Sequence, residues 1–250
     1  MLEIKNLSFG YGKKQVLYDI NLSINDGTFT AVIGLNGSGK STFLSCIACL
    51  NSFSGSILLD DKDFTLLPRY QRATMLSYLP QSVKSVPFTA LELVSMGRNP
   101  YKTSENKAKS LAKACLDELG LLHLSDKKVN EISGGERQLC YFATVLCQDA
   151  DLMLLDEPAN GMDIGNEEKI YRISKQRCIN EGKTVIAVMH NLSNAVKYAD
   201  NIIILHSGKA VFFGSKEKCL DRQAIEKHFG VKKYVCGDNG TRQIFFSKDI

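Results

Sequence analysis

The segment that most restricts the fold of this chain is a glycine-rich stretch, GLNGSGKST, at residues 34–42. It matches the pattern GxxxxGK[ST], and it lies between an apolar run at 29–33 and a segment, TFLSCIACL, that suits a buried helix. A strand, a glycine-rich turn and a helix in this order predict a loop whose backbone N–H groups converge on nucleotide phosphates. We expect Lys40 to reach the β- and γ-phosphates and Ser41 to ligate Mg²⁺. The loop residues expected to bind the nucleotide are Gly34, Asn36, Gly37, Ser38, Gly39, Lys40, Ser41 and Thr42.

Apolar runs place this loop in an α/β fold. Three runs, at 29–33, 152–155 and 184–189, lack the alternation of a half-exposed strand and are typical of strands buried on both faces of a parallel sheet. Between the runs, one segment carries apolar residues at helical spacing, namely Leu139, Phe142, Ala143, Leu146 and Cys147. Strands that alternate with helices predict an α/β P-loop NTPase core with a parallel sheet.

Other segments differ in character from this core. Residues 2–9 and 15–24 place apolar residues among polar ones, which predicts an N-terminal antiparallel β subdomain. Residues from about 86 to 148 contain no convincing strand, and we interpret them as an inserted helical lobe. Two extended segments flank the glycine-containing stretch 237–240, so a hairpin is expected over about 232–247. The whole chain, 1–250, is expected to form one ATPase domain with these additions.

The apolar run at 152–155 is followed directly by two carboxylates, Asp156 and Glu157. Open parallel sheets bind their ligands at the carboxyl ends of the strands, so both side chains are expected at the edge where the phosphate loop lies. Asp156 would hold the Mg²⁺ shell, and Glu157 would orient or deprotonate the attacking water. The pair therefore predicts the acidic half of a nucleotide-hydrolysing site.

A second anion site is predicted at the start of the helical stripe. The segment ISGGERQ places Ser133, Gly134 and Gly135 at a helix N-terminus, where free N–H groups and the helix dipole favour an anion. The phosphate loop of the same chain already supplies one anion-binding site. The second site therefore indicates that each nucleotide site is completed by another copy of the chain, in trans.

These three motifs, in this order and spacing, resemble those of the nucleotide-binding subunit of ABC transporters, and the resemblance covers nearly the whole chain. It implies roles for four further residues. Tyr11 resembles the aromatic residue that stacks on adenine, and Gln81 resembles the glutamine that senses Mg²⁺ and the attacking water. Asp163 resembles the aspartate at the dimer seam, and His190 resembles the histidine that contacts the γ-phosphate.

A narrower resemblance concerns the substrate. Residues 88–101, which contain Gly-Arg-Asn-Pro, and the carboxyl-terminal segment 228–246 resemble importer ATPases for ferric siderophores, haem and cobalamin. This resemblance implies an ATP- and Mg²⁺-dependent homodimer that drives a separate membrane permease and works indirectly with a substrate-binding protein. We expect the subunit to be cytoplasmic and peripheral on the inner face of the cell membrane, because no apolar stretch in the sequence reaches the length of a membrane span.

Two alternatives use the same motifs. A soluble ABC ATPase of iron–sulfur cluster assembly would need no permease, and the Gly-Arg-Asn-Pro segment argues against it. A DNA-repair or chromosome-organising ATPase would need long heptad segments, and the interval between Lys40 and Ser133 is too short to hold them. With 31 basic and 27 acidic residues the net charge is only +4, so no nucleic-acid partner is expected.

Overall fold

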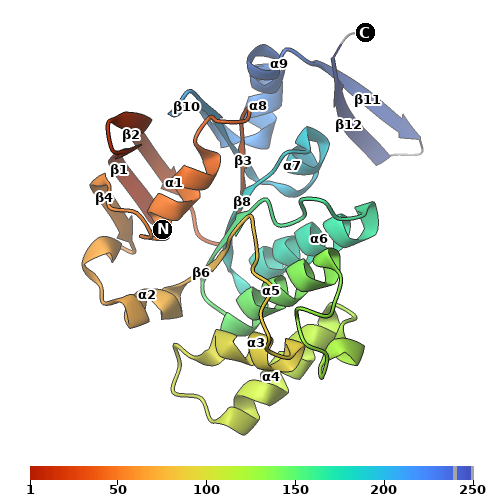
Figure 1. The fold of residues 1–250 in the computed structure, drawn as a ribbon. Helices are drawn as coiled ribbons and strands as arrows, with labels where there is room; N and C mark the ends of the chain where they lie inside the picture. Colours follow the sequence, from red (N-terminus) through yellow and green to blue (C-terminus); the bar gives the residue numbers. More distant parts are fainter. Residues whose placement is uncertain (239–240, 249–250) are drawn as a thin grey trace. The chain divides into compact units, whose positions relative to one another are not determined.

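The computed structural model of the chain describes residues 1–238 and 241–248, and Figure 1 labels most of its helices and strands. The chain forms two compact units. Unit 1 consists of Met1–Leu66 and Lys175–Ile250, and unit 2 consists of Leu67–Ser174. Unit 2 contains the segment 86–148 that the sequence marks as helical, together with residues on either side of it.

Unit 1 begins with an antiparallel sheet. Its strands are β1 (Leu2–Tyr11), β2 (Lys14–Ile24), β4 (Ser54–Leu59) and β5 (Lys62–Asp63), in the order β2-β1-β4-β5. All three pairings between neighbours are antiparallel. The apolar residues that recur among polar ones in β1 and β2 are largely buried. The predicted N-terminal antiparallel β subdomain is therefore confirmed.

A second sheet of unit 1 has the strands expected of a nucleotide-binding core. In the order β10-β9-β3-β8, it contains β10 (Lys209–Ser215), β9 (Asn201–His206), β3 (Phe29–Ile33) and β8 (Thr184–Val188). Strand β3 pairs in parallel with both β8 and β9, whereas β10 is antiparallel to β9. Every residue of β3 and β8 is buried, which confirms that these runs are strands covered on both faces.

The carboxyl end of unit 1 is a two-stranded ribbon. Strand β11 (Lys232–Asp238) pairs antiparallel with β12 (Thr241–Ser247), and β12 lies against α7 (Leu192–Tyr198) (Figure 1). Residues 239–240 lie outside the described part of the chain. The four-residue turn predicted at 237–240 therefore falls partly outside it as well.

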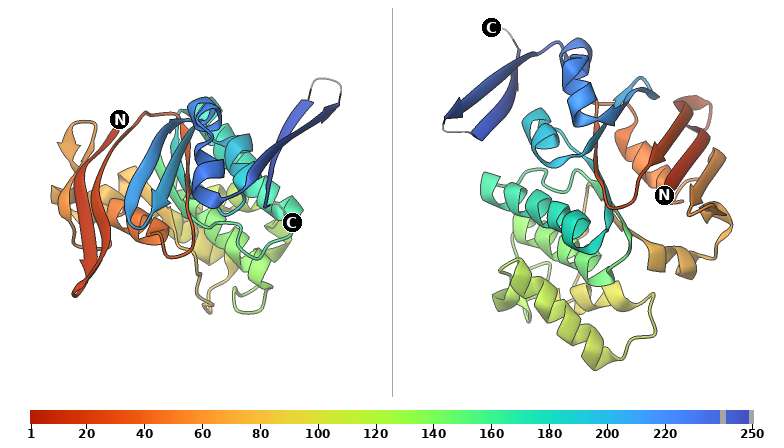
Figure 2. Two further views of the ribbon diagram at one scale, coloured as in Figure 1. Left: turned by 90° about the horizontal axis from the view of Figure 1, so that it is seen from above. Right: turned by 180° about the vertical axis from the view of Figure 1, so that it is seen from behind.

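Unit 2 combines two parallel strands with a group of helices. Strand β6 (Leu76–Leu79) pairs in parallel with β7 (Leu152–Asp156). Helices α3 (Ala90–Ser95), α4 (Glu105–Glu118) and α5 (Gly134–Gln148) pack on one another, as the yellow to green helices of Figure 2 show. The apolar stripe of α5 that the sequence predicts is buried in this group. The lobe is thus a three-helix layer attached to a strand pair.

The remaining helices are short, apart from α6. They are α1 (Lys40–Ile47), α2 (Arg69–Met75), α6 (Ile164–Glu181), α8 (Lys216–Asp221), α9 (Ala224–Phe229) and the 3₁₀ turns η1 (Phe64–Leu66), η2 (Met96–Arg98) and η3 (Leu122–Leu124). Within 1–238 and 241–248, none of the helices combines the length and apolar character that crossing a bilayer requires.

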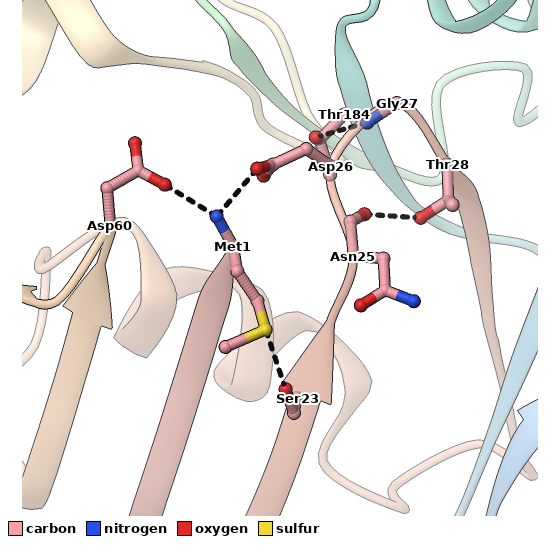
Figure 3. Close-up of polar contacts among 8 residues, drawn as sticks. All are labelled: Met1, Ser23, Asn25, Asp26, Gly27, Thr28, Asp60 and Thr184. Atoms are coloured by element: carbon pink, nitrogen blue, oxygen red, sulfur yellow. Dashed lines mark hydrogen bonds and ion pairs between the residues drawn. The ribbon is translucent and has the colours of Figure 1, made fainter.

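A polar cluster joins the amino terminus to two turns of unit 1 (Figure 3). The α-amino group of Met1 forms ion pairs with Asp26 at 2.7 Å and with Asp60 at 2.6 Å. Burial alone would lower the pKa of this amine, but the hydrogen bonds that it donates to the carboxylates of Asp26 and Asp60 raise it above the ordinary value overall. In the same region the backbone N–H of Gly27 donates to Thr184 Oγ1 at 3.2 Å, which ties the β2–β3 turn to β8.

The turn between β9 and β10 supports the phosphate loop. The backbone N–H of Gly208 donates to the carbonyl of Ser38 at 3.1 Å, and the carbonyl of Gly208 accepts from the N–H of Tyr18 at 2.9 Å. Gly208 has a φ of +77°, and a Cβ atom there would collide with the carbonyl oxygen of Val16. Only glycine therefore fits at this junction between the two sheets.

We expect Gly208→Ala to lower the free energy of unfolding by roughly 3 kcal/mol, because a steric collision adds to a left-handed backbone strain of about 1–2 kcal/mol. Gly182→Ala is the matched control, since Gly182 also has a positive φ, +68°, but no heavy atom lies within 4 Å of its built Cβ. The control should lose only about 1 kcal/mol. Urea denaturation measures both, and equal losses would contradict the proposed collision.

Candidate functional site

The phosphate loop connects the buried strand β3 to α1. Gly39 precedes the helix with φ 101° and ψ 10°, a conformation that glycine adopts readily. Its carbonyl accepts the N–H of Phe43 at 2.8 Å, which is the first helical hydrogen bond. The loop therefore presents the positive end of α1 directly beyond a strand that cannot move without disrupting the core.

The side chains of the loop fit an oxyanion ligand. Ser38 is only 5% exposed, and its Oγ is buried with no hydrogen-bond partner in the structure. Lys40 is 6% exposed, and its Nζ donates to the carbonyls of Gly34 at 3.0 Å and Leu35 at 3.2 Å. A buried hydroxyl without a partner is costly unless a ligand supplies one. The loop therefore has the donors that a phosphate requires.

The other predicted residues of the loop lie around these donors. Asn36 and Gly37 are exposed at its tip, while Ser41 and Thr42 are half-buried in the first turn of α1. This first turn is where a hydroxyl ligand of a phosphate-bound cation has to lie. The arrangement is consistent with the predicted roles, which remain predictions.

Two further predicted residues lie in unit 1. His190 is exposed and follows β8, and the pairing of Val32 with Val188 brings it to the same sheet edge as the start of the phosphate loop. Tyr11 ends β1, is 57% exposed, and packs its ring edge-to-face on Phe9 with centroids 4.8 Å apart. The histidine is therefore positioned by the sheet, and the tyrosine ring is accessible to a planar partner.

In unit 2 the strand register brings Gln81 and Glu157 together. Strands β6 and β7 pair Leu79 with Leu155, and each of the two polar residues lies two positions beyond its leucine. Gln81 Nε2 donates to Glu157 Oε2 at 2.7 Å. Asp156 ends β7 and is only 2% exposed, so the predicted carboxylate pair lies at the end of a buried strand.

A residue that the sequence reasoning missed also holds Glu157. Asn160 Nδ2 donates to the same Oε2 oxygen at 3.2 Å. Glu157 itself has a φ of 49°, which is uncommon for a residue other than glycine and typically marks a constrained functional position. The side-chain amides of Gln81 and Asn160 thus hold the carboxylate of Glu157 in one orientation. The spacing of Asn160, three residues after Glu157 in a turn, was the available signal.

Ser133 begins α5 as predicted, and it forms a capping box with Glu136. The N–H and Oγ of Ser133 donate to Glu136 Oε2 at 2.9 and 2.7 Å, and the N–H of Glu136 donates to Ser133 Oγ at 3.3 Å. The hydrogen bonds from Ser133 hold the pKa of Glu136 below its usual value. A Cβ atom built on Gly135 would meet no heavy atom within 4 Å, so an anion could approach the glycine backbone. The pattern Ser-x-x-Glu was the signal for this box.

Asp163 begins α6 as a helix cap. Its Oδ1 accepts the backbone N–H of Asn166 at 2.9 Å, and its Oδ2 accepts the side-chain amide of Asn166 at 2.7 Å. These bonds, the backbone one above all, lower the pKa of Asp163. The side chain is exposed, so a role at a dimer seam remains a prediction that its surroundings permit.

The predicted site residues therefore fall into two groups. Unit 1 holds the phosphate loop, Tyr11 and His190, and unit 2 holds the carboxylates, Gln81 and the start of α5. Among the described residues, no three or more His, Cys, Asp or Glu side chains gather as a metal site. Mg²⁺ needs only one or two protein ligands beside nucleotide phosphates. Ser41, Gln81 and Asp156 stay the predicted groups that hold or sense the cation.

The sequence and the fold both have known counterparts. The family model described as "ABC transporter" matches residues 17–160. The chain is 34% identical to the hemin import ATP-binding protein HmuV of Shewanella denitrificans, over 91% of this chain and 92% of that protein. It is 32% identical to the ferric enterobactin transport ATP-binding protein FepC of Escherichia coli, over 94% and 89%. A dimeric ATP-binding cassette, MJ0796, bound to ADP and Pi, has a TM-score of 0.80 and 28% identity, covering 86% of this chain and 99% of its own.

We expect Ser38→Ala to leave the free energy of unfolding unchanged or slightly higher, because it removes a buried hydroxyl that has no partner. The same change should weaken ATP binding roughly tenfold, since a hydrogen bond to a charged group is worth about 1.5 kcal/mol or more. Ser45→Ala is the matched control on α1, because Ser45 Oγ already donates to the carbonyl of Thr42 at 2.8 Å.

The control should lose stability and keep its ATP affinity. Calorimetric titration and chemical denaturation measure the two effects. A Ser38→Ala protein that is destabilised but binds ATP normally would rule out the assigned role of this hydroxyl.

Proposed function

This chain belongs to the ABC transporter family, and we propose that it is the ATP-hydrolysing subunit that powers import of a metal chelate through a separate membrane permease. The cargo class is a ferric siderophore, haem or a cobalamin-like chelate. The names of the two relatives, one for hemin and one for ferric enterobactin, support an iron chelate. The observation that carries the proposal is that the glycine-rich loop before α1 and the capped, glycine-containing start of α5 lie on different units of one chain.

The hydrolytic chemistry requires few groups of this chain. Bound Mg²⁺ and ATP would supply the electrophilic γ-phosphate, and Ser41 and Asp156 would hold the cation. Glu157, oriented by the amides of Gln81 and Asn160, would accept the proton of the attacking water. Because Gln81 donates to Glu157, a movement of the glutamine changes the orientation of the base. Transport and hydrolysis can be linked through this hydrogen bond.

Two copies would complete each other's sites. Lys40 and the phosphate loop of one chain would face Ser133, Gly134, Gly135 and Asp163 of the other, with Tyr11 against adenine and His190 near the γ-phosphate. The resemblance to a dimeric cassette supports this arrangement. ADP lacks the phosphate that the start of α5 would bind, so closure would require ATP and hydrolysis would reopen the dimer.

A membrane permease is the principal partner in this proposal. The subunit would bind it from the cytoplasmic side, at the inner face of the cell membrane, and a substrate-binding protein would act on the outside without touching this chain. Similarity to import proteins over nearly the whole chain favours this function over iron–sulfur cluster assembly.

Glu157→Gln should reduce ATP hydrolysis by about a hundredfold or more, because general base catalysis typically contributes 10²–10⁴-fold. The isosteric change should preserve ATP binding and trap a dimer, which size-exclusion chromatography in ATP and Mg²⁺ would detect. Adding Ser133→Arg to Glu157→Gln should return the protein to monomers, because the long side chain fills the position of the incoming phosphate. Undiminished turnover of Glu157→Gln would assign the water to another residue.

The cargo class can be tested in cells that lack this subunit. Uptake of ferric siderophore, haem and cobalamin should be measured after complementation with the unaltered gene or with Lys40→Ala. We expect loss of at least one of these activities in the deletion strain, recovery with the unaltered gene, and no recovery with Lys40→Ala. Normal uptake of all three, with loss of a different solute, would refute the cargo class and leave the ATPase function intact.

A further inference from the structure

We propose that Arg98 is a positioning residue that couples the two ATP sites of the dimer. This inference rests on the proposed function, because it requires paired sites that share each chain. Arg98 lies in unit 2, within the turn η2 that follows α3. It is not among the residues expected to touch nucleotide.

Arg98 binds the carboxyl end of α5. Its Nη1 donates to the carbonyl of Cys147 at 3.1 Å and to the carbonyl of Gln148 at 3.2 Å. A guanidinium at a helix C-terminus satisfies carbonyls that have no helical partner and complements the negative end of the dipole. The guanidinium carbon also lies 4.0 Å from the ring centroid of Tyr101, which is a cation–π contact.

The same helix end is bonded to the segment that leads into β6. Gln148 Nε2 donates to the carbonyls of Ala73 at 2.7 Å and Leu76 at 2.9 Å. Tyr101 Oη donates to the carbonyl of Thr74 at 3.0 Å. We call Arg98, Tyr101 and Gln148 the α5 clamp. It joins η2, the last turn of α5 and the start of β6 by hydrogen bonds to backbone carbonyls.

The two structures that the clamp joins serve different ATP molecules. Strand β6 leads to Gln81, which is bonded to Glu157 and would act on ATP held by the same chain. Helix α5 begins at Ser133, which would bind the γ-phosphate of ATP held by the partner copy. Helix α5 is one continuous element of 15 residues, so a displacement of its start can reach its carboxyl end. Binding at one site is therefore communicated to the base of the other.

The packing of Arg98 leaves one of its donors unsatisfied. Its Nε is buried and has no hydrogen-bond partner in the structure, and an unpaired buried donor costs free energy. The neighbouring Gly97 lets η2 approach α5 closely, since a Cβ atom there would lie 2.9 Å from the backbone nitrogen of Gln148. The close contact holds the guanidinium against the helix end even though one donor stays unpaired.

The test is the cooperativity of the full-length protein toward ATP. Hill coefficients should be measured for steady-state hydrolysis and, in the Glu157→Gln background, for ATP-induced dimer formation. We expect a coefficient approaching 2 for the unaltered clamp and about 1 for Arg98→Ala, because the coupling between sites is lost. Arg98→Lys, which keeps the charge but not the planar guanidinium, should recover part of the difference. Arg172→Ala, an exposed arginine of α6, is the control and should leave the coefficient unchanged.

A milder variant covers the case in which Arg98→Ala folds poorly. Tyr101→Phe keeps the ring under the guanidinium and removes only the bond to Thr74, so it should give an intermediate coefficient. Clamp variants that unfold more easily but keep the original coefficient would show a purely structural role and overturn the proposal. If the protein with an unaltered clamp forms ATP-induced dimers with a Hill coefficient of 1, the proposed coupling is wrong and the proposed function stands. Failure of ATP to induce dimers at all would overturn the proposed function.

Discussion

Complete burial of β3 is the constraint on which the rest of unit 1 depends. None of its residues reaches solvent, so its backbone has to be paired on both sides, by β8 and β9. Because β3 and β8 are parallel, the chain leaves β3 at the sheet edge where β8 also ends. The phosphate loop and His190 meet at that edge because of strand register, and the loop then gains the helix dipole of α1. The positions of the phosphate loop and of His190 thus follow from backbone pairing in the core.

Unit 2 uses register in the same way but with a different chemical result. Parallel pairing of β6 and β7 puts an amide beside a carboxylate, and Asn160 adds a second amide to the same oxygen. These two amides hold the carboxylate in a fixed orientation at the carboxyl end of the strand pair. The loop of unit 1 instead presents N–H, hydroxyl and ammonium donors.

Local patterns in the sequence predicted most of the fold. The motif at 34–42, the buried runs of β3, β7 and β8, and the apolar stripe of α5 depend on neighbours along the chain, and all were recognised. Strands β9 and β10 were not predicted, although their turn carries Gly208 and supports the loop. The contacts of Asn160 and Arg98 were also missed, because bonds from a side chain to a distant oxygen or to another element's backbone leave no periodic signal. The residue types in the motifs thus predicted which groups would bind phosphate or accept a proton. The orientation of those side chains depends on contacts between elements far apart in the sequence.

The capping box of α5 means that an anion at the helix start has to compete with Glu136 for the donors of Ser133. In the single chain both donors of Ser133 already bind an internal carboxylate, that of Glu136. Inorganic phosphate arriving from solution would exchange one set of hydrogen bonds for a similar set and gain little free energy. A net gain arises only when a second group of donors surrounds the same phosphate. The capping box would therefore favour an anion that another protein surface also binds over free phosphate.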